Sequence, residues 1–250
     1  DRPLLRQLQD MDRPASTNQP LEALVEASSA AWAQHEKTGD PRFIFSFSGD
    51  PALVTAVKNA WPDPDDKALQ ILDTLQSTLE INQSWMQGRG WESNAQRAAV
   101  LRSNFLHHWQ HAKQSGSAPK VLVKLGANHV VRGLNMTGTF DLGTLLAEIE
   151  DGRSYSVLVL PGAESMVAVL NPSTWSFEPK PAKDNYAEGI EVLIDAAYDD
   201  TFTLIDLAAL RSIVGTRIDQ YGVDVVRIVH GFDMLLVMSG STASSELDHE

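Results

Sequence analysis

Residues 120–141 read KVLVKLGANHVVRGLNMTGTFD, and the interpretation of the rest of the chain begins from this stretch. Apolar residues at 121, 122, 123 and 125 follow a turn-forming segment, GSAP, at 116–119. A short apolar run bounded by such a turn is typical of a strand that is buried on both faces. The sequence therefore predicts a buried strand of an α/β sheet that ends at Gly126.

The polar residues after this run are the first candidates for a functional site. In open parallel sheets, ligands bind in the crevice beyond the carboxyl ends of the strands. Asn128, His129 and Arg132 are therefore expected to face such a crevice. A second interpretation stays open, because a single histidine in a loop often has only a structural role.

The composition and net charge of the chain make some classes of binding partner less favourable than others. The chain has 250 residues, 43% of them hydrophobic, which is enough to bury a sizeable core. Its formal charge of −13 disfavours nucleic acid and anionic membrane surfaces, since both repel an acidic protein. A small-molecule substrate is the simpler expectation. The absence of cysteine excludes disulfides and thiolate chemistry, and no apolar run approaches membrane-spanning length.

The first part of the chain, residues 1–92, is predicted to be mostly helical and to pack on the core or be inserted into it. Apolar residues recur at helical spacing after Pro3 and Pro20, and Asp50 and Pro51 mark the start of another helix. Residues 42–48, RFIFSFS, alternate as a strand does, and residues 81–91 are predicted to be a loop between helices.

A helix over about 93–113 leads into the predicted central strand. Arg97 and Asn104 lie on or near one of its faces, toward the end that would approach the crevice. An inward-facing Arg97 would need an ionic partner, for which Glu80, Glu164 and Asp141 are the candidates. The alternative is that this polar stripe is the solvated face of the helix.

The remaining chain continues the α/β pattern. Asp141 should cap a helix over 142–149, and residues 155–160 should form a second buried strand with Glu164 in the turn after it. Glu164 is a second carboxylate candidate or an ordinary loop residue. A long loop or lid is predicted over 171–184. Residues 192–196 should form a strand, and 201–205 should begin a helix or strand. Residues 225–229 and 234–238 are two apolar runs on either side of a His-Gly-Phe-Asp turn.

These patterns predict an α/β fold with a mostly parallel central sheet, flanking helices and a helical N-terminal part or insertion. The α/β core is expected over 93–238, and the polar residues 239–250 are expected to be a disordered tail.

Several motifs together resemble the erythromycin esterase-like superfamily, in its broad bacterial branch. They are the Arg97, Leu101, Asn104 and Phe105 spacing, KVLVKLGANHVVRGLN at 120–135, FDLGTLL at 140–146 and GFDMLLVM at 231–238. The match covers roughly residues 95–150. The Gly-x-x-His form of residues 126–129 is also similar to that of TIKI-type metalloproteases. The resemblance implies hydrolysis by histidine-activated water, with an arginine and carboxylates around the site.

This chain departs from the family pattern in one respect. Family members usually carry an early Gly-Glu-x-His strand end, which this sequence lacks. The expectation is that an N-terminal strand precedes this chain, or that the protein is a binding or degenerate member. The protein would then reside in a bacterial cytoplasm or be exported after removal of a leader. No oligomeric state is predicted.

The function predicted from these residues is hydrolysis of an ester or related bond of a small molecule. The catalytic candidates are His129, Arg97 and Glu164, and the substrate-binding candidates are Asn104, Asn128, Arg132 and Asp141. No cofactor is predicted, and no metal site, because His129 has no second ligand at a recognisable spacing. The alternatives are a non-catalytic small-molecule binding protein on the same fold and a metal-dependent hydrolase or peptidase.

Overall fold

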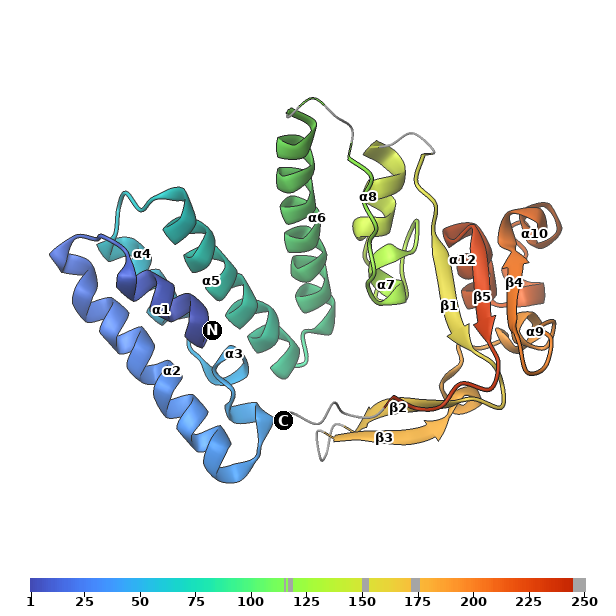
Figure 1. The fold of residues 1–250 in the computed structure, drawn as a ribbon, viewed down its shortest axis with the longest axis horizontal. Helices are drawn as coiled ribbons and strands as arrows, with labels where there is room; N and C mark the ends of the chain where they lie inside the picture. Colours follow the sequence, from blue (N-terminus) through green and yellow to red (C-terminus); the bar gives the residue numbers. More distant parts are fainter. Residues whose placement is uncertain (115, 117–118, 150–152, 172–175, 245–250) are drawn as a thin grey trace. The chain divides into compact units, whose positions relative to one another are not determined.

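A computed structural model describes residues 1–114, 116, 119–149, 153–171 and 176–244 (Figure 1). The chain divides into two compact units, Asp1–Val100 and Leu101–Glu250. The division falls inside helix α6 (Gly90–Gln114), whereas the sequence placed a boundary at the start of that helix.

The first unit is helical, as the spacing of its apolar residues predicts. Its helices are α1 (Arg2–Asp10), α2 (Asn18–Thr38), α3 (Phe45–Ser48), α4 (Pro51–Ala60) and α5 (Asp66–Met86), with short 3-10 turns at Ala15–Thr17 and Pro41–Phe43. The Asp50 side chain accepts a hydrogen bond from the amide of Ala52 at the start of α4, which confirms the predicted cap. Leu8, Leu24, Val54 and Leu72 lie fully buried in the core of this unit.

Two predictions for the first unit are wrong. Residues 42–48 are not a strand, because Asp40 caps a helical turn at Arg42 and only Phe45 of the segment is buried. The predicted loop at 81–91 is mostly helix, because α5 continues to Met86 with Ile81 buried. Short apolar segments do not distinguish a strand from a helix by their pattern alone.

The second unit contains a three-stranded sheet in the order β1-β5-β4. Its strands are β1 (Val157–Pro161), β4 (Phe202–Asp206) and β5 (Met234–Met238). β1 pairs parallel with β5, and β4 pairs antiparallel with β5. Alternation along the strands buries Leu158, Leu235 and Val237 on one face of the sheet.

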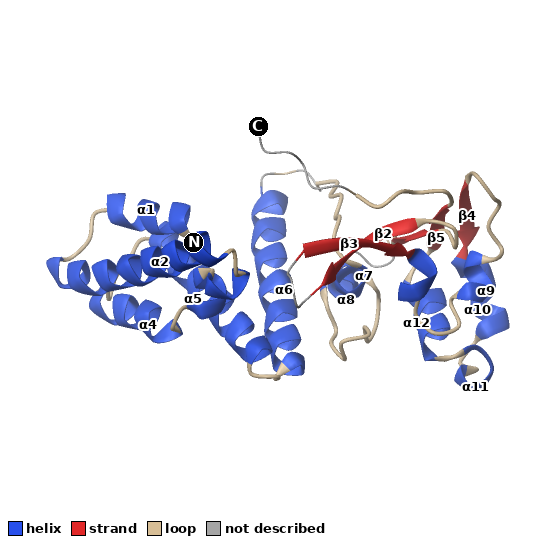
Figure 2. Cartoon of the chain, turned by 90° about the horizontal axis from the view of Figure 1, so that it is seen from below, coloured by secondary structure: helices blue, strands red, loops and turns tan. Residues whose placement is uncertain are grey.

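The buried face of the sheet, which carries Leu158, Leu235 and Val237, is covered by helices. The remaining elements of this unit are α7 (Ala127–Val130), α8 (Leu142–Ile149), β2 (Met166–Asn171), β3 (Ser176–Pro181), a 3-10 turn at Ala182–Asn185, α9 (Glu191–Ile194), α10 (Leu207–Val214), α11 (Ile218–Tyr221) and α12 (Val223–Gly231). Figure 2 shows α9, α10 and α12 on the same side of the sheet, where Leu207 and Val229 join its buried core. On the opposite face, the side chains of Val157, Val159 and Leu204 are exposed.

The predicted fold class is wrong. Among the described residues, only one strand pair is parallel, and the remaining strands, β2 and β3, form a separate antiparallel hairpin. The segment 121–125 belongs to no strand or helix. The apolar run 225–229 belongs to α12, with Val225 and Val229 buried one helical turn apart.

Four further segments can be compared with their predictions. The helix over 142–149 is confirmed with its predicted bounds, and the strand predicted over 155–160 is observed as β1. Within the predicted lid, Ser176–Pro181 form β3 and 182–184 belong to the 3-10 turn, while 172–175 lie outside the described residues. In the tail, Ser241 accepts a hydrogen bond from the amide of Met166 (2.9 Å), so it is held against β2, and residues 245–250 lie outside the described part.

The contact between α7 and α8 requires a glycine. A methyl group on Gly143 would lie 2.2 Å from the carbonyl oxygen of Val130. The absence of a side chain therefore allows the first turn of α8 to approach the end of α7.

We expect Gly143→Ala to destabilise the second unit by about 1–3 kcal/mol, because the added methyl group must push two backbone segments apart. Urea denaturation followed by circular dichroism measures this loss. Gly126→Ala is the matched control, since its new methyl group meets its nearest neighbour, Cδ2 of His129, at 3.9 Å. Equal stability of the two variants would contradict the close approach.

Candidate functional site

His129 lies on the short helix α7, which follows an irregular segment, 120–126. The amide of His129 donates to the carbonyl of Gly126 (2.9 Å), and the amide of Val131 donates to the carbonyl of Ala127 (3.0 Å). His129 is therefore presented by one helical turn and not by the end of a strand, which corrects the predicted origin of this side chain.

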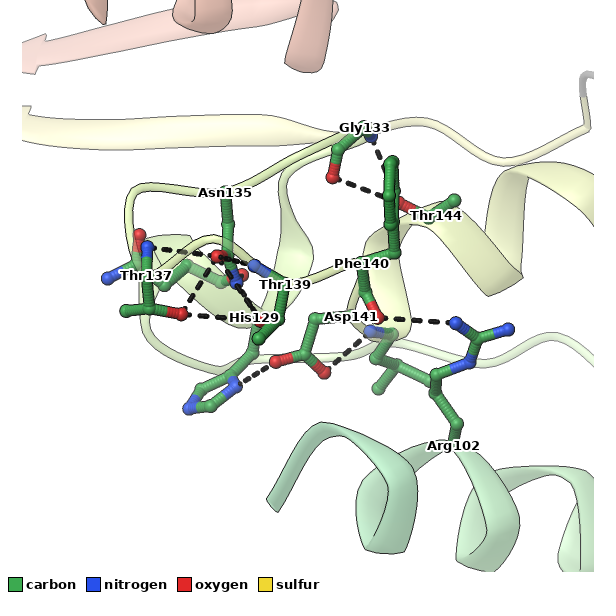
Figure 3. Close-up of polar contacts among 11 residues, drawn as sticks. Arg102, His129, Gly133, Asn135, Thr137, Thr139, Phe140, Asp141 and Thr144 are labelled. Atoms are coloured by element: carbon green, nitrogen blue, oxygen red, sulfur yellow. Dashed lines mark hydrogen bonds and ion pairs between the residues drawn. The ribbon is translucent and has the colours of Figure 1, made fainter. Parts of the chain in front are cut away.

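Asp141 binds the imidazole of His129. Nδ1 of His129 lies 2.7 Å from Oδ2 of Asp141, as Figure 3 shows. The Asp141 side chain is only 2% exposed, and its Oδ1 accepts a hydrogen bond from the amide of Leu142 (2.7 Å). Both carboxylate oxygens thus have donors, and the positive end of helix α8 adds to their stabilisation.

The bond to Asp141 determines which nitrogen of His129 is available for chemistry. Because an ionised carboxylate can only accept hydrogen bonds, Nδ1 carries the proton in the neutral ring, and Nε2 presents a lone pair. Within the described ranges, no residue forms a hydrogen bond with Nε2. The side chain is 27% exposed, so this nitrogen can meet a water molecule.

A buried asparagine shapes the loop between His129 and Asp141. Oδ1 of Asn135 accepts hydrogen bonds from the backbone amides of Thr137 and Thr139, both at 3.0 Å. Its Nδ2 donates to the carbonyl of Asn128 (2.9 Å), which joins the loop to α7. Asn135 is 1% exposed. These hydrogen bonds hold the loop between α7 and α8 in a closed conformation, and Asp141 at its end lies beside His129.

Arg102 also supports this loop. Its Nη1 donates to the carbonyl oxygen of Phe140 (3.2 Å), the residue before Asp141. Asn135, Thr139 and Arg102 were not among the sequence-predicted site residues. The spacing Asn135-x-Thr137-x-Thr139 is the one local signal of the loop, because asparagine side chains often bind the backbone two residues later.

Arg132 is engaged by Asp233 rather than directed to a ligand. Its guanidinium forms an ion pair with the Asp233 carboxylate, which also accepts from Arg211 (3.2 Å) and from the amide of Ser156 (2.8 Å). Burial alone would raise the pKa of Asp233. The hydrogen bonds from Arg132, Ser156 and Arg211 outweigh that effect, and the net shift of this pKa is downward.

Apart from Asp141, none of the predicted site residues forms a hydrogen bond or ion pair with the side chain of His129. Arg97 belongs to the first unit, is exposed, and forms no hydrogen bond or ion pair with a described residue, so the expected carboxylate partner is not observed. Asn104 is an exposed residue of α6, and Glu164 is exposed in the turn between β1 and β2. Asn128 is half-buried beside His129.

A cavity of about 430 Å³ lies in the second unit, but His129 does not line it. Its walls are residues 119–123, residues 153–157, the α6 rings of Phe105 and Trp109, and parts of α7 and α8. Arg132 lies at its wall and is the one predicted site residue there. The hydrogen-bonded pair His129–Asp141 and the cavity are therefore separate features of this unit.

The described residues present neither a cluster of metal ligands nor a helix that could span a membrane. No group of three or more histidine, cysteine or acidic side chains is placed to hold a metal ion there. None of the described helices combines the length and the apolar character that crossing a bilayer requires.

No protein-family model, curated protein sequence or solved structure matches this chain. Evidence for its function therefore comes from the geometry of its own residues.

The Asp233 ion pairs should make the second unit sensitive to acid. Since the pKa of Asp233 is lower in the folded chain than its ordinary value of 3.8, its stabilisation is fully present above that pH. The stabilisation is lost as pH falls through the lowered pKa. We expect Asp233→Asn to cost about 3 kcal/mol at pH 7, the low end for buried pairs, because Arg211 is one-third exposed.

Urea denaturation at pH 7 and near pH 3 measures this effect. The difference between parent and Asp233→Asn should shrink at the lower pH, where the parent carboxylate begins to bind a proton. Asp199→Asn, in an exposed turn, is the control and should have parental stability at pH 7. An equal destabilisation by Asp233→Asn at both pH values would show that charge is not its cause.

Proposed function

We propose that this protein is a hydrolase in which His129 activates a water molecule, with Asp141 as the residue that orients His129. The observation that carries the proposal is the 2.7 Å hydrogen bond between Nδ1 of His129 and the buried carboxylate of Asp141. This arrangement leaves Nε2 of a partly exposed ring as a proton acceptor, which is what a general base requires.

The proposed reaction proceeds through water. Nε2 of His129 takes a proton from a water molecule as its oxygen attacks the carbonyl carbon of an ester or related group. Asp141 stabilises the imidazolium that forms, and its hydrogen bond keeps the ring in place. The imidazolium then returns the proton to the departing alkoxide, so that an acid and an alcohol leave.

The developing oxyanion needs a hydrogen-bond donor. The Asn128 amide is the best placed of the predicted groups, because Asn128 precedes His129 and its side chain binds no described residue. Arg132 is less suitable, since its charge is compensated by Asp233. Arg97 and Glu164 keep no role in this proposal, because neither is bonded to the His129–Asp141 pair.

The second candidate is a non-catalytic small-molecule binding protein. The observation in its favour is that the 430 Å³ cavity is lined by Arg132 and aromatic rings but not by His129. Cavities of this size hold small ligands in other proteins. In that case, the His129–Asp141 bond would serve only to hold α7 against α8.

Replacing His129 separates these two functions. With a panel of chromogenic esters and lactones, we expect His129→Ala to lower kcat/KM by about a hundredfold or more, as loss of a general base does. Asp141→Asn should cause a loss of similar size, because the amide NH2 would donate to Nδ1 and leave the proton on Nε2. Initial rates, measured with and without a chelator of divalent metals, provide the test.

His111→Ala is the matched control, because it removes an exposed histidine from α6. Its rate should equal that of the parent. Parental rates for His129→Ala, or turnover of no substrate in the panel, would argue against the hydrolase and favour the binding protein. A rate abolished by the chelator would instead favour the metal-dependent alternative.

A further inference from the structure

The helix α7 is too short to hold His129 in place by its own hydrogen bonds. It has a single turn, and a helix needs several turns before its hydrogen bonds offset the loss of chain entropy. Gly126 and Ala127, at its start, are exposed and contribute little packing. The orientation of His129 toward Asp141 therefore depends on contacts from other parts of the chain.

The chain is held at several points after His129. The amide of Arg132 donates to the carbonyl of Gly231 (3.1 Å). The amide of Gly133 donates to the hydroxyl of Thr144 (2.9 Å), and that hydroxyl donates to the carbonyl of Gly133 (3.2 Å). These hydrogen bonds fix the chain at the C-terminal side of α7 and leave its N-terminal side to another contact.

Asn135 supplies the contact before His129. In a longer helix, the carbonyl of Asn128 would accept from the amide of Arg132, but that amide donates to Gly231. Nδ2 of Asn135 takes its place at 2.9 Å. Among the described residues, no other group outside α7 forms a hydrogen bond with residues 126–128.

The hydrogen bonds of the Asn135 side chain fix its orientation (Figure 3). Oδ1 accepts from the amides of Thr137 and Thr139, both at 3.0 Å, and Nδ2 also donates to the hydroxyl of Thr139 (2.9 Å). Exchanging the oxygen and the nitrogen would set the oxygen against the carbonyl of Asn128 and the NH2 group against two amides. At 1% exposure, such unpaired groups are costly. Asn135 thus joins α7 to the loop before Asp141 in one geometry.

We propose that Asn135 is a positioning residue, whose side-chain amide holds the imidazole of His129 in line with the carboxylate of Asp141. This inference rests on the proposed function, in which Nδ1 keeps its proton so that Nε2 can accept one. Without the amide, the N-terminal side of α7 can move away from the loop. The Nδ1 proton then loses its acceptor and is free to move to Nε2.

Two variants remove the hydrogen bond to α7 and keep an acceptor for the loop. Asn135→Asp retains an oxygen for the amides of Thr137 and Thr139, but a carboxylate cannot donate to the carbonyl of Asn128. Asn135→Ser introduces no charge. Its one hydroxyl accepts from the amide two residues later and leaves the carbonyl of Asn128 without a donor.

We expect both variants to lower kcat for a chromogenic ester at pH 8 by about tenfold or more, since a misplaced base acts poorly on water. KM should stay within about twofold of the parent value, because the lost interaction is not one with substrate. Nitrogen NMR of the isotopically labelled chain measures the tautomer directly. The parent should carry the proton of His129 on Nδ1, and the variants should divide it between Nδ1 and Nε2.

Asn82→Asp is the matched control. Asn82 is a half-buried residue of α5, and its Nδ2 donates to the carbonyl of Ser46 (2.8 Å) in the first unit. The variant loses a hydrogen bond of the same type, so it should lower the stability of that unit. Its kcat and the tautomer of His129 should equal those of the parent, which separates positioning from general destabilisation.

The tautomer also separates this inference from the proposed function. A parental tautomer in folded Asn135→Asp and Asn135→Ser would overturn the positioning role, even if the parent hydrolyses esters in a manner that depends on His129. An altered tautomer in a chain that hydrolyses no ester would support the positioning role and count against the hydrolase.

Should circular dichroism show that neither variant folds, the parent chain decides. The side-chain amide protons of Asn135 should exchange with solvent at least about tenfold more slowly than those of the exposed Asn18, because both are held in hydrogen bonds. Slow exchange would support the bond to α7. Equal exchange rates would overturn the inference.

Discussion

The carboxylate of Asp233 accepts hydrogen bonds from three separate segments of the second unit, through Arg132, Arg211 and the amide of Ser156. The segment before α7 has no strand pairing, so the chain around α7 needs other attachments to the sheet. Arg132 provides one through its side chain and a second through its amide, which donates to the carbonyl of Gly231 (3.1 Å). The position of the candidate site therefore depends on Asp233.

Side-chain packing adds to these polar attachments. Val131 is buried and lies against Gly231, where a methyl group would come within 2.3 Å of its Cγ2 atom. Ser156 also donates from its hydroxyl to the carbonyl of Val130 (3.2 Å). The turn that carries His129 is thus held at its C-terminal end by the β1 and β5 region, and Gly143 allows α8 to approach it from another direction. A general base must be held in this way to act on water in one orientation.

In the part of the second unit that the structure describes, helices cover one face of the sheet and apolar side chains of the other face are exposed, which distinguishes it from the predicted α/β fold. In a mostly parallel sheet, helices cover both faces and the strands are uniformly apolar. Here β1 and β4 are both edge strands with exposed apolar side chains. The uniformly apolar sequences that suggested a doubly covered sheet therefore belong to strands that have one open face.

The sequence by itself determined the elements whose signals are local. The helix after Asp141, the helix after Asp50 and the strand around 157–161 follow from caps and apolar runs a few residues long. It also placed His129 and Asp141 among the candidate site residues. Neither their contact nor their separate roles followed from it, because they lie 12 residues apart in a loop without regular spacing.

The conformations of two apolar segments and the partner of Arg132 were decided only by the tertiary structure. The run 225–229 is a helix because one of its sides packs on the sheet, whereas 121–125 pairs with no described strand and forms none. Arg132 binds Asp233, 101 residues away, and is thereby removed from the predicted ligand site. Pairing partners and buried ionic contacts depend on residues distant in sequence, so local pattern alone does not specify them.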